Sequence, residues 1–156
     1  MFDIDINIRG DEDIAKELRR DIKQLSSLLS KRADVGIFES KTDRDDGKTN
    51  AEIGLAHEFG VPQNNLPQRS FLRQPIIDGS FEAMLNEREI KMNKNILSQI
   101  AKIFLKAVKE EFKSNGRGFW ASLSDKTSRR ENKNRDQILR DTKQLYESLE
   151  MRVVDK

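Results

Sequence analysis

The side chains able to do chemistry are few, and their spacing does not suit catalysis. His57 is the single histidine of 156 residues and stands beside Glu58, as in the helix of a zinc protease. Such a helix needs a second histidine four residues later, where this chain has Val61. One histidine without cysteine or a carboxylate cluster cannot build a usual transition-metal site. We therefore expect His57 to pack or hydrogen-bond locally at a helix end.

Other catalytic and cofactor patterns fail in the same way. Ser70 and Ser80 have no base at triad spacing, and the glycine-rich stretch at 114–118 lacks the preceding strand and the following lysine of a phosphate-binding loop. The aspartates within 41–50 could chelate a metal weakly, but a solvated loop is the favoured interpretation. The sequence predicts no enzyme, no catalytic residue, no cofactor and no metal site.

Two arginines four residues apart, Arg69 and Arg73, flank Phe71. Arginine is the usual choice for a fixed, bidentate pair with a carboxylate or a phosphate. The partner could be Glu58, a neighbouring subunit or DNA, and an internal pair is favoured. Trp120 is either a core residue or an interface anchor, and burial is favoured because tryptophan is mostly buried on average.

The stretch AHEFGVPQNNLPQRSFLRQP, at 56–75, is interpreted as a structural joint. A glycine ends the short helix expected at 51–59, and the prolines stop that helix and set the angle at which the next one begins. A phenylalanine on each side is expected to pin the joint to the core. The residues of this predicted joint are Phe59, Gly60, Pro62, Pro67 and Phe71.

Hydrophobic periodicity predicts the elements that position the joint. Alternation over 2–8 indicates a strand with one buried face, and 12–30 is an amphipathic helix. A second strand is expected at 35–38, and a last strand at 151–154 is expected to pair at the edge of the same sheet.

The apolar stripe from 80 to 114 predicts a helix of roughly 50 Å, which is longer than a small domain is wide. Such a helix must pack on another chain or break, and Asn93 is the expected break. We expect a mobile polar loop at 41–50 and a hinge at 114–118 before a C-terminal helical segment. The predicted fold is a single α+β domain over 1–156, with a small antiparallel sheet packed against a long helix and two or three shorter helices.

Charge limits the classes of partner. A net charge of only +2 argues against a dedicated nucleic-acid binder. The segment 113–143 is nevertheless basic, which can order subunits head to tail or turn one face toward nucleic acid, although a solvated surface is favoured. No apolar run approaches the roughly 20 residues of a membrane span, so synthesis in a cytoplasm is expected. The candidate interface or electrostatic residues are Glu58, Arg69, Arg73, Trp120, Arg129, Arg130 and Arg135.

The order of these features resembles the virion-morphogenesis proteins of tailed bacteriophages, which are tail-completion or neck proteins. In that family a short helix reads like "hEfG" and the following joint like "iPaRpFlr", and this chain has HEFG and LPQRSFLR. This chain departs from the family at three positions. It has Ser70 where the family often has proline, Lys143 where the family often has glycine, and Gln68 where the family has a small residue. A second block of matching residues is Trp120, Leu123, Thr127, Ile138, Leu139, Thr142, Leu145 and Ser148.

The resemblance implies an α+β structural protein of the virion neck, made in the host bacterial cytoplasm, with no catalysis. It implies self-assembly as a ring, often sixfold, at the head–tail junction. The expected partners are other neck, portal-side and tail-tube proteins, with DNA passing through the lumen and contacted weakly at most. An alternative is a small DNA-binding regulator that uses the basic C-terminal helix at 129–140. A third hypothesis, an inhibitor of a host enzyme, would need a surface of one charge sign.

Overall fold

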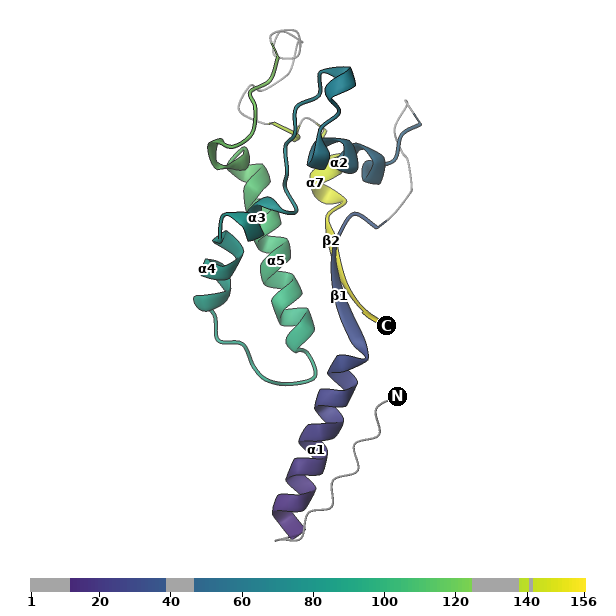
Figure 1. Ribbon diagram of the computed structural model, residues 1–156, viewed down its shortest axis with the longest axis vertical. Coiled ribbons are helices and arrows are strands. Elements are labelled where there is room, and N and C mark those ends of the chain that lie inside the picture. Colours follow the sequence, from purple (N-terminus) through teal and green to yellow (C-terminus); the bar gives the residue numbers. More distant parts are fainter. Residues whose placement is uncertain (1–11, 39–46, 125–137, 141) are drawn as a thin grey trace.

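A projecting helix, a two-stranded ribbon and a second long helix dominate the computed structural model (Figure 1). The structure describes residues 12–38, 47–124, 138–140 and 142–156. The described helices and strands are, in chain order, α1 (Glu12–Leu29), β1 (Lys31–Gly36), α2 (Asn50–Phe59), η1 (Pro62–Asn64), α3 (Gln74–Ile77), α4 (Ser80–Asn86), α5 (Ile96–Lys113), η2 (Gly116–Gly118), α7 (Gln144–Glu147) and β2 (Glu150–Asp155).

The α1 helix confirms the amphipathic helix predicted at 12–30. It runs almost directly into β1 and extends away from the rest of the molecule (Figure 1). Most of its apolar stripe remains exposed, because few other elements lie along the helix. The strand expected at 2–8 lies outside the described residues.

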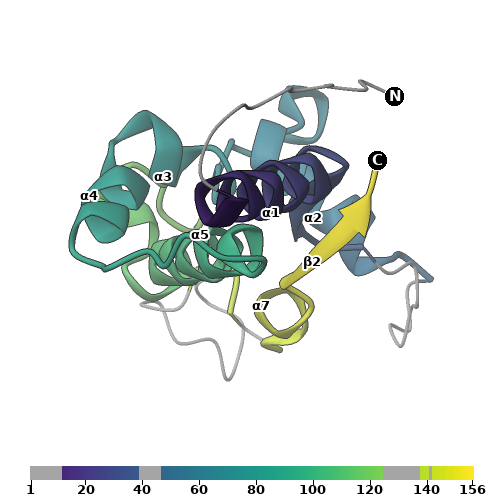
Figure 2. The same ribbon diagram turned by 90° about the horizontal axis from the view of Figure 1, so that it is seen from below.

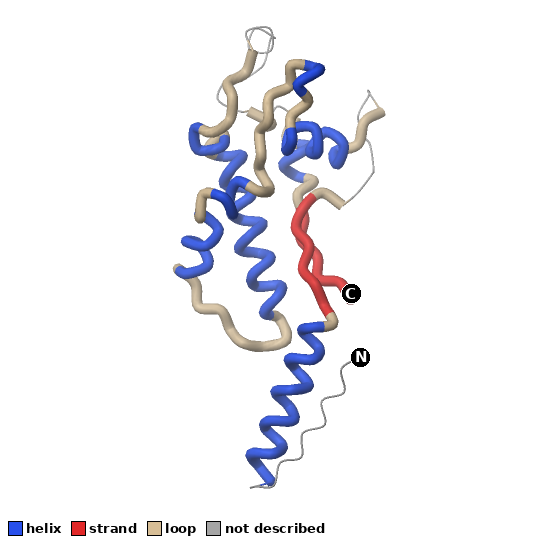
Figure 3. Tube along the Cα trace, viewed as in Figure 1, coloured by secondary structure: helices blue, strands red, loops and turns tan. Residues whose placement is uncertain are grey.

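The ribbon pairs β1 with β2 in antiparallel register, from Lys31 opposite Asp155 to Gly36 opposite Glu150. The last strand is therefore confirmed. The second strand begins four residues earlier than predicted, because pairing with β2 recruits polar residues that carry no hydrophobic signal. The α5 helix packs on this ribbon (Figure 3), which confirms an α+β fold with a small antiparallel sheet against a long helix.

The stripe from 80 to 114 is broken, as one of the two expected alternatives required, and does not form one continuous helix. The chain forms α4, leaves helical geometry between residues 87 and 95, and returns as α5, so that Asn93 lies within the break. The α4 helix lies beside α5 (Figure 2), and the rings of Phe81 and Phe104 meet with centroids 5.0 Å apart. Excess helix length is therefore no argument for a partner.

Side-chain hydrogen bonds hold the connection between α4 and α5 and the first turn of α2. The side chain of Gln99 holds the connection by accepting from Lys91 N–H at 3.1 Å and donating to its carbonyl at 3.0 Å. Thr49 begins α2 with a capping box. Its hydroxyl accepts from the N–H of Glu52, and the carboxylate of Glu52 accepts from the N–H of Thr49. The rest of the loop predicted at 41–50 lies largely outside the described residues.

Candidate functional site

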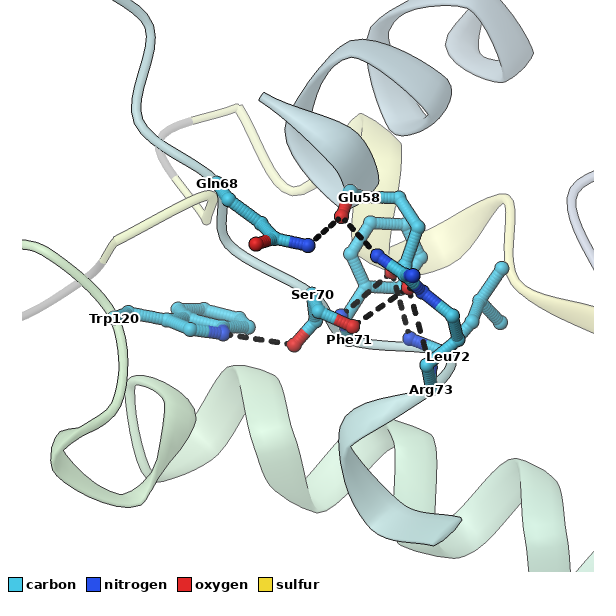
Figure 4. A network of polar contacts seen from close by, with 7 residues as sticks. All are labelled: Glu58, Gln68, Ser70, Phe71, Leu72, Arg73 and Trp120. Carbon is cyan, nitrogen blue, oxygen red and sulfur yellow. Dashed lines mark hydrogen bonds and ion pairs between the residues drawn. The ribbon is translucent and has the colours of Figure 1, made fainter. Parts of the chain in front are cut away.

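The carboxylate of Glu58 is the centre of the predicted joint (Figure 4). It lies in the last turn of α2 and is only 4 % exposed. One oxygen accepts from the N–H groups of Phe71 at 2.8 Å and Leu72 at 2.9 Å. The other accepts from the Ser70 hydroxyl at 2.6 Å and from Arg73 through N–H at 3.2 Å and Nε at 2.9 Å. A single side chain thus satisfies the donors of a whole loop.

These bonds decide the protonation state of Glu58. Burial by itself raises its pKa, because the charged form loses water. Hydrogen bonds from Leu72, Ser70, Arg73 and Phe71 outweigh burial and bring the pKa below its ordinary value. The joint therefore contains an ionised carboxylate that is matched by donors.

Arg73 confirms the internal pair predicted for it. In addition to its bond with the carboxylate, its Nη2 donates to the backbone carbonyl of Glu58 at 3.1 Å. Its guanidinium lies over the ring of Phe59, 4.5 Å from the centroid. The arginine therefore covers the outer side of the joint.

Phe59 does not pin the joint to the core, contrary to prediction: it is 57 % exposed. The buried face of α2 consists of Gly54 and Glu58, which are four residues apart. Leu55 and Phe59 have the same spacing but lie on the outer face. Sequence reasoning assigned Phe59 to the interior because it did not expect the inward position to hold a carboxylate.

Arg69 has different partners from Arg73. Its Nε donates to the carbonyl of Ala121 at 3.1 Å and its Nη2 to that of Ser122 at 3.2 Å. The side chain is almost wholly buried, and burial lowers its pKa, although a guanidinium remains charged in proteins. Two carbonyl oxygens thus compensate a buried charge and tie the joint to a segment about fifty residues further along the chain.

Trp120 is buried, as predicted, and makes the second tie between these segments. Its indole N–H donates to the carbonyl of Ser70 at 2.9 Å (Figure 4). Phe71 is fully buried, as predicted, and its ring packs at a tilt against that of Phe112, with centroids 5.0 Å apart. Phe112 in turn meets Trp120 edge-on at 5.6 Å. Gly116 lies directly against the indole, where an added Cβ would come within 2.2 Å of its ring.

The turn of the joint also follows the prediction. Gly60 ends α2 with φ of 74°, and an added Cβ would lie 2.9 Å from the backbone nitrogen of Gln68. Pro62 begins η1, and Val61 and Leu66 exchange backbone hydrogen bonds across the turn at 2.9 and 3.1 Å. The half-buried Pro67 then starts the extended segment that reaches the Glu58 carboxylate.

The surroundings of His57 fit the local structural role expected for it. Its carbonyl accepts from Arg69 N–H at 2.7 Å, and its ring Nδ1 is buried without a hydrogen-bond partner in the described structure. Burial, followed by the charge of Arg69, lowers its pKa from 6.5 to about 4. The ring is therefore neutral near neutral pH.

A second buried acid escaped sequence reasoning. Glu111 of α5 is fully buried and lies 3.0 Å from Nε of Arg117, but without hydrogen-bond geometry. Arg117 also lies 3.6 Å from Asp78. Burial raises the pKa of Glu111, Arg117 lowers it in part, and Asp78 raises it again. Its position between Val108 and Phe112 on the apolar stripe was the available signal.

Arg129, Arg130 and Arg135 lie outside the described residues, so the DNA-binding alternative stays a prediction. Within the described ranges, no group of three or more acidic or histidine side chains could hold a metal ion. None of the helices described there is long and apolar enough to cross a membrane.

Comparison of the chain with protein-family models, with curated proteins and with solved structures found no match. What the geometry itself defines is a joint with buried polar ties. Its hydrogen bonds hold the end of α2, the segment 69–73 and the segment 120–122 in fixed relation. Such a joint presents a rigid body from which the exposed α1 helix extends.

Proposed function

We propose that this chain is a structural subunit of a tailed-bacteriophage neck that assembles as a ring and completes the tail at the head–tail junction. The observation that carries the proposal is the exposed apolar stripe of the projecting α1 helix. The exposed fractions are 63 % for Ile14, 40 % for Leu18, 53 % for Leu25 and 73 % for Leu29. Large contiguous apolar surfaces commonly mark interaction sites.

The proposed kind of assembly comes from the resemblance to neck proteins. The residues that carry this resemblance are the ones that make the contacts of the joint. Glu58, Gly60, Arg69 and Phe71 belong to the resembling block and also make the joint's contacts. Trp120, from the second resembling block, donates to the first one. Two short motifs far apart in the sequence thus meet in one structural unit, which supports the resemblance that rests on both of them.

In this proposal the body is a rigid spacer and α1 is a contact element. A rigid joint suits a ring, because small errors in the angle between the parts of a subunit accumulate around a closed assembly. The neighbours are further copies, other neck and portal-side proteins, and the tail tube. DNA passes through the lumen without tight phosphate contacts.

The test is the mass of the assembly in solution, measured by light scattering for the chain alone and with purified tail-tube protein. We expect a mass several times the 18.1 kDa of one chain, or a defined complex that forms when tube protein is added. A strict monomer that binds neither tube nor neck protein would overturn the proposal.

A further inference from the structure

The contact between copies can be assigned more closely from the charges that border the α1 stripe. With 100° of rotation per residue, Ile14, Leu18, Ile22, Leu25 and Leu29 fall within about 80° of one another. The stripe extends over the length of an 18-residue helix, which is about 27 Å.

The two edges of this stripe differ in charge. Glu17 and Asp21 lie along one edge, whereas Arg19 lies on the other side, and all three side chains are exposed. These charges lie in the middle of the helix.

Direction decides which edges meet. In an antiparallel pair centred on the helix, each edge meets its own kind, so that Asp21 would face Asp21 of the other copy and Arg19 would face Arg19. In a parallel pair the acidic edge of one copy meets the basic edge of the other. Asp21 of one copy and Arg19 of the other then differ in height along the helix axis by only about 3 Å. Opposite charges attract across such seams and like charges destabilise them.

We infer that α1 is a self-association helix that packs parallel to α1 of a second copy, stripe against stripe, with Asp21 of one copy beside Arg19 of the other. Copies related by rotation about an axis along the helices have this direction. The inference rests on the proposed function, since it names the contact by which copies would assemble.

Disulfide trapping tests the direction, because the chain contains no cysteine. Ile14→Cys and Leu29→Cys place a thiol near either end of the stripe, and Ser27→Cys, on the opposite side of the helix, is the matched control. The parallel arrangement predicts a disulfide between equal positions in each of the first two variants and little in the control. In an equimolar mixture of both variants, peptide mass spectrometry should find 14–14 and 29–29 links.

Mixed 14–29 links in excess of equal-position links would overturn the parallel arrangement. Suppose that the wild-type chain forms a larger assembly but the Ile14→Cys and Leu29→Cys variants form no more disulfide than Ser27→Cys. This result would overturn the α1 contact and leave the proposed neck role standing. A wild-type chain that stays monomeric under all conditions and binds no tube protein would instead remove the proposed function, and this contact with it.

A charge exchange provides the second readout. Asp21→Arg should weaken self-association by about tenfold, and Arg19→Asp combined with Asp21→Arg should restore it to within about threefold, measured by sedimentation equilibrium. An antiparallel seam predicts no such recovery, because each edge there meets its own kind before and after the exchange. Equal affinity of all three proteins would overturn the assignment, provided that circular dichroism shows the same helix content.

Discussion

The joint around Glu58 and the α1 helix differ in which side chains they bury and which they expose. The joint buries charged and polar groups and gives nearly every one of them a partner within the same chain. The α1 helix does the reverse, since it exposes leucine and isoleucine along a helix that projects from the body. The first region is complete in one copy and should determine stability. The second is incomplete in one copy and should determine association.

Glu58→Ala should be the most damaging change in the joint. It leaves several buried N–H groups and the Arg73 guanidinium without their acceptor, and such losses cost about 4 kcal/mol. Urea unfolding measures the free energy. Glu82→Ala, an exposed change on α4, is the control and should stay within about 0.5 kcal/mol. Similar losses for the two variants would contradict the central place given to Glu58.

Gly116→Ala should have the second largest effect and lower the free energy of unfolding by about 3 kcal/mol. The new methyl group would meet the Trp120 indole, and the backbone φ at this position is 72°. Gly79→Ala is matched in φ, at 74°, but has open space around its Cβ position. It should cost only about 1 kcal/mol. Thermal or urea unfolding of both proteins separates the contact with tryptophan from backbone strain, and equal losses would mean that the indole can move aside.

Arg69→Lys should reduce the free energy of unfolding by about 2 kcal/mol. A lysine ammonium cannot reproduce the fork that reaches the carbonyls of Ala121 and Ser122. Arg73→Lys should cost less, because that side chain is half exposed and lysine can still pair with Glu58. Hydrogen exchange of the 120–124 backbone should rise in the first variant only. A larger effect at position 73 would reverse the roles assigned to the two arginines.

Stability should fall as the pH drops from about 6.5 toward 4. The pKa of His57 is lowered in the folded state, so the unfolded chain binds a proton in this range and the folded chain resists it. The lowered pKa of Glu58 acts in the same direction at more acidic pH, since its stabilisation is lost as the carboxylate is protonated. His57→Gln should flatten the upper part of the curve of unfolding free energy against pH. An unchanged slope there would exclude His57 as its source.

Leu25→Ser should have the smallest effect on the stability of the monomer, within about 0.5 kcal/mol, because the side chain is already half exposed. The same change should clearly weaken association. Unfolding at a protein concentration low enough to keep the chain monomeric isolates the first effect. A loss comparable to that of Arg69→Lys would mean that α1 packs on its own chain.

Local patterns predicted what depends on local contacts. Periodicity located α1, and the glycine and proline signals after α2 located the turn at Gly60 and Pro62. The inward direction of Glu58 could not be predicted, because its donors lie twelve to fifteen residues away and meet it only after the turn has formed. The carbonyl partners of Arg69 are more distant still.

The same reasoning explains the errors. An apolar residue was assumed to face inward, so Phe59 was assigned to the core and Glu111 was overlooked on the buried stripe of α5. The break expected at Asn93 was found, but its extent from 87 to 95 was not predicted, because Ile90 and Met92 continue the apolar pattern through it.

The central claim is that the body folds alone and α1 joins the copies. Sedimentation equilibrium of the wild-type chain and of Leu18→Asp/Leu25→Asp, at the same concentration, tests it most directly. We predict an assembly for the wild type and a folded 18.1 kDa monomer for the variant, with association weakened by more than about a hundredfold. Assemblies of equal mass in both proteins, or monomers in both, would contradict the account.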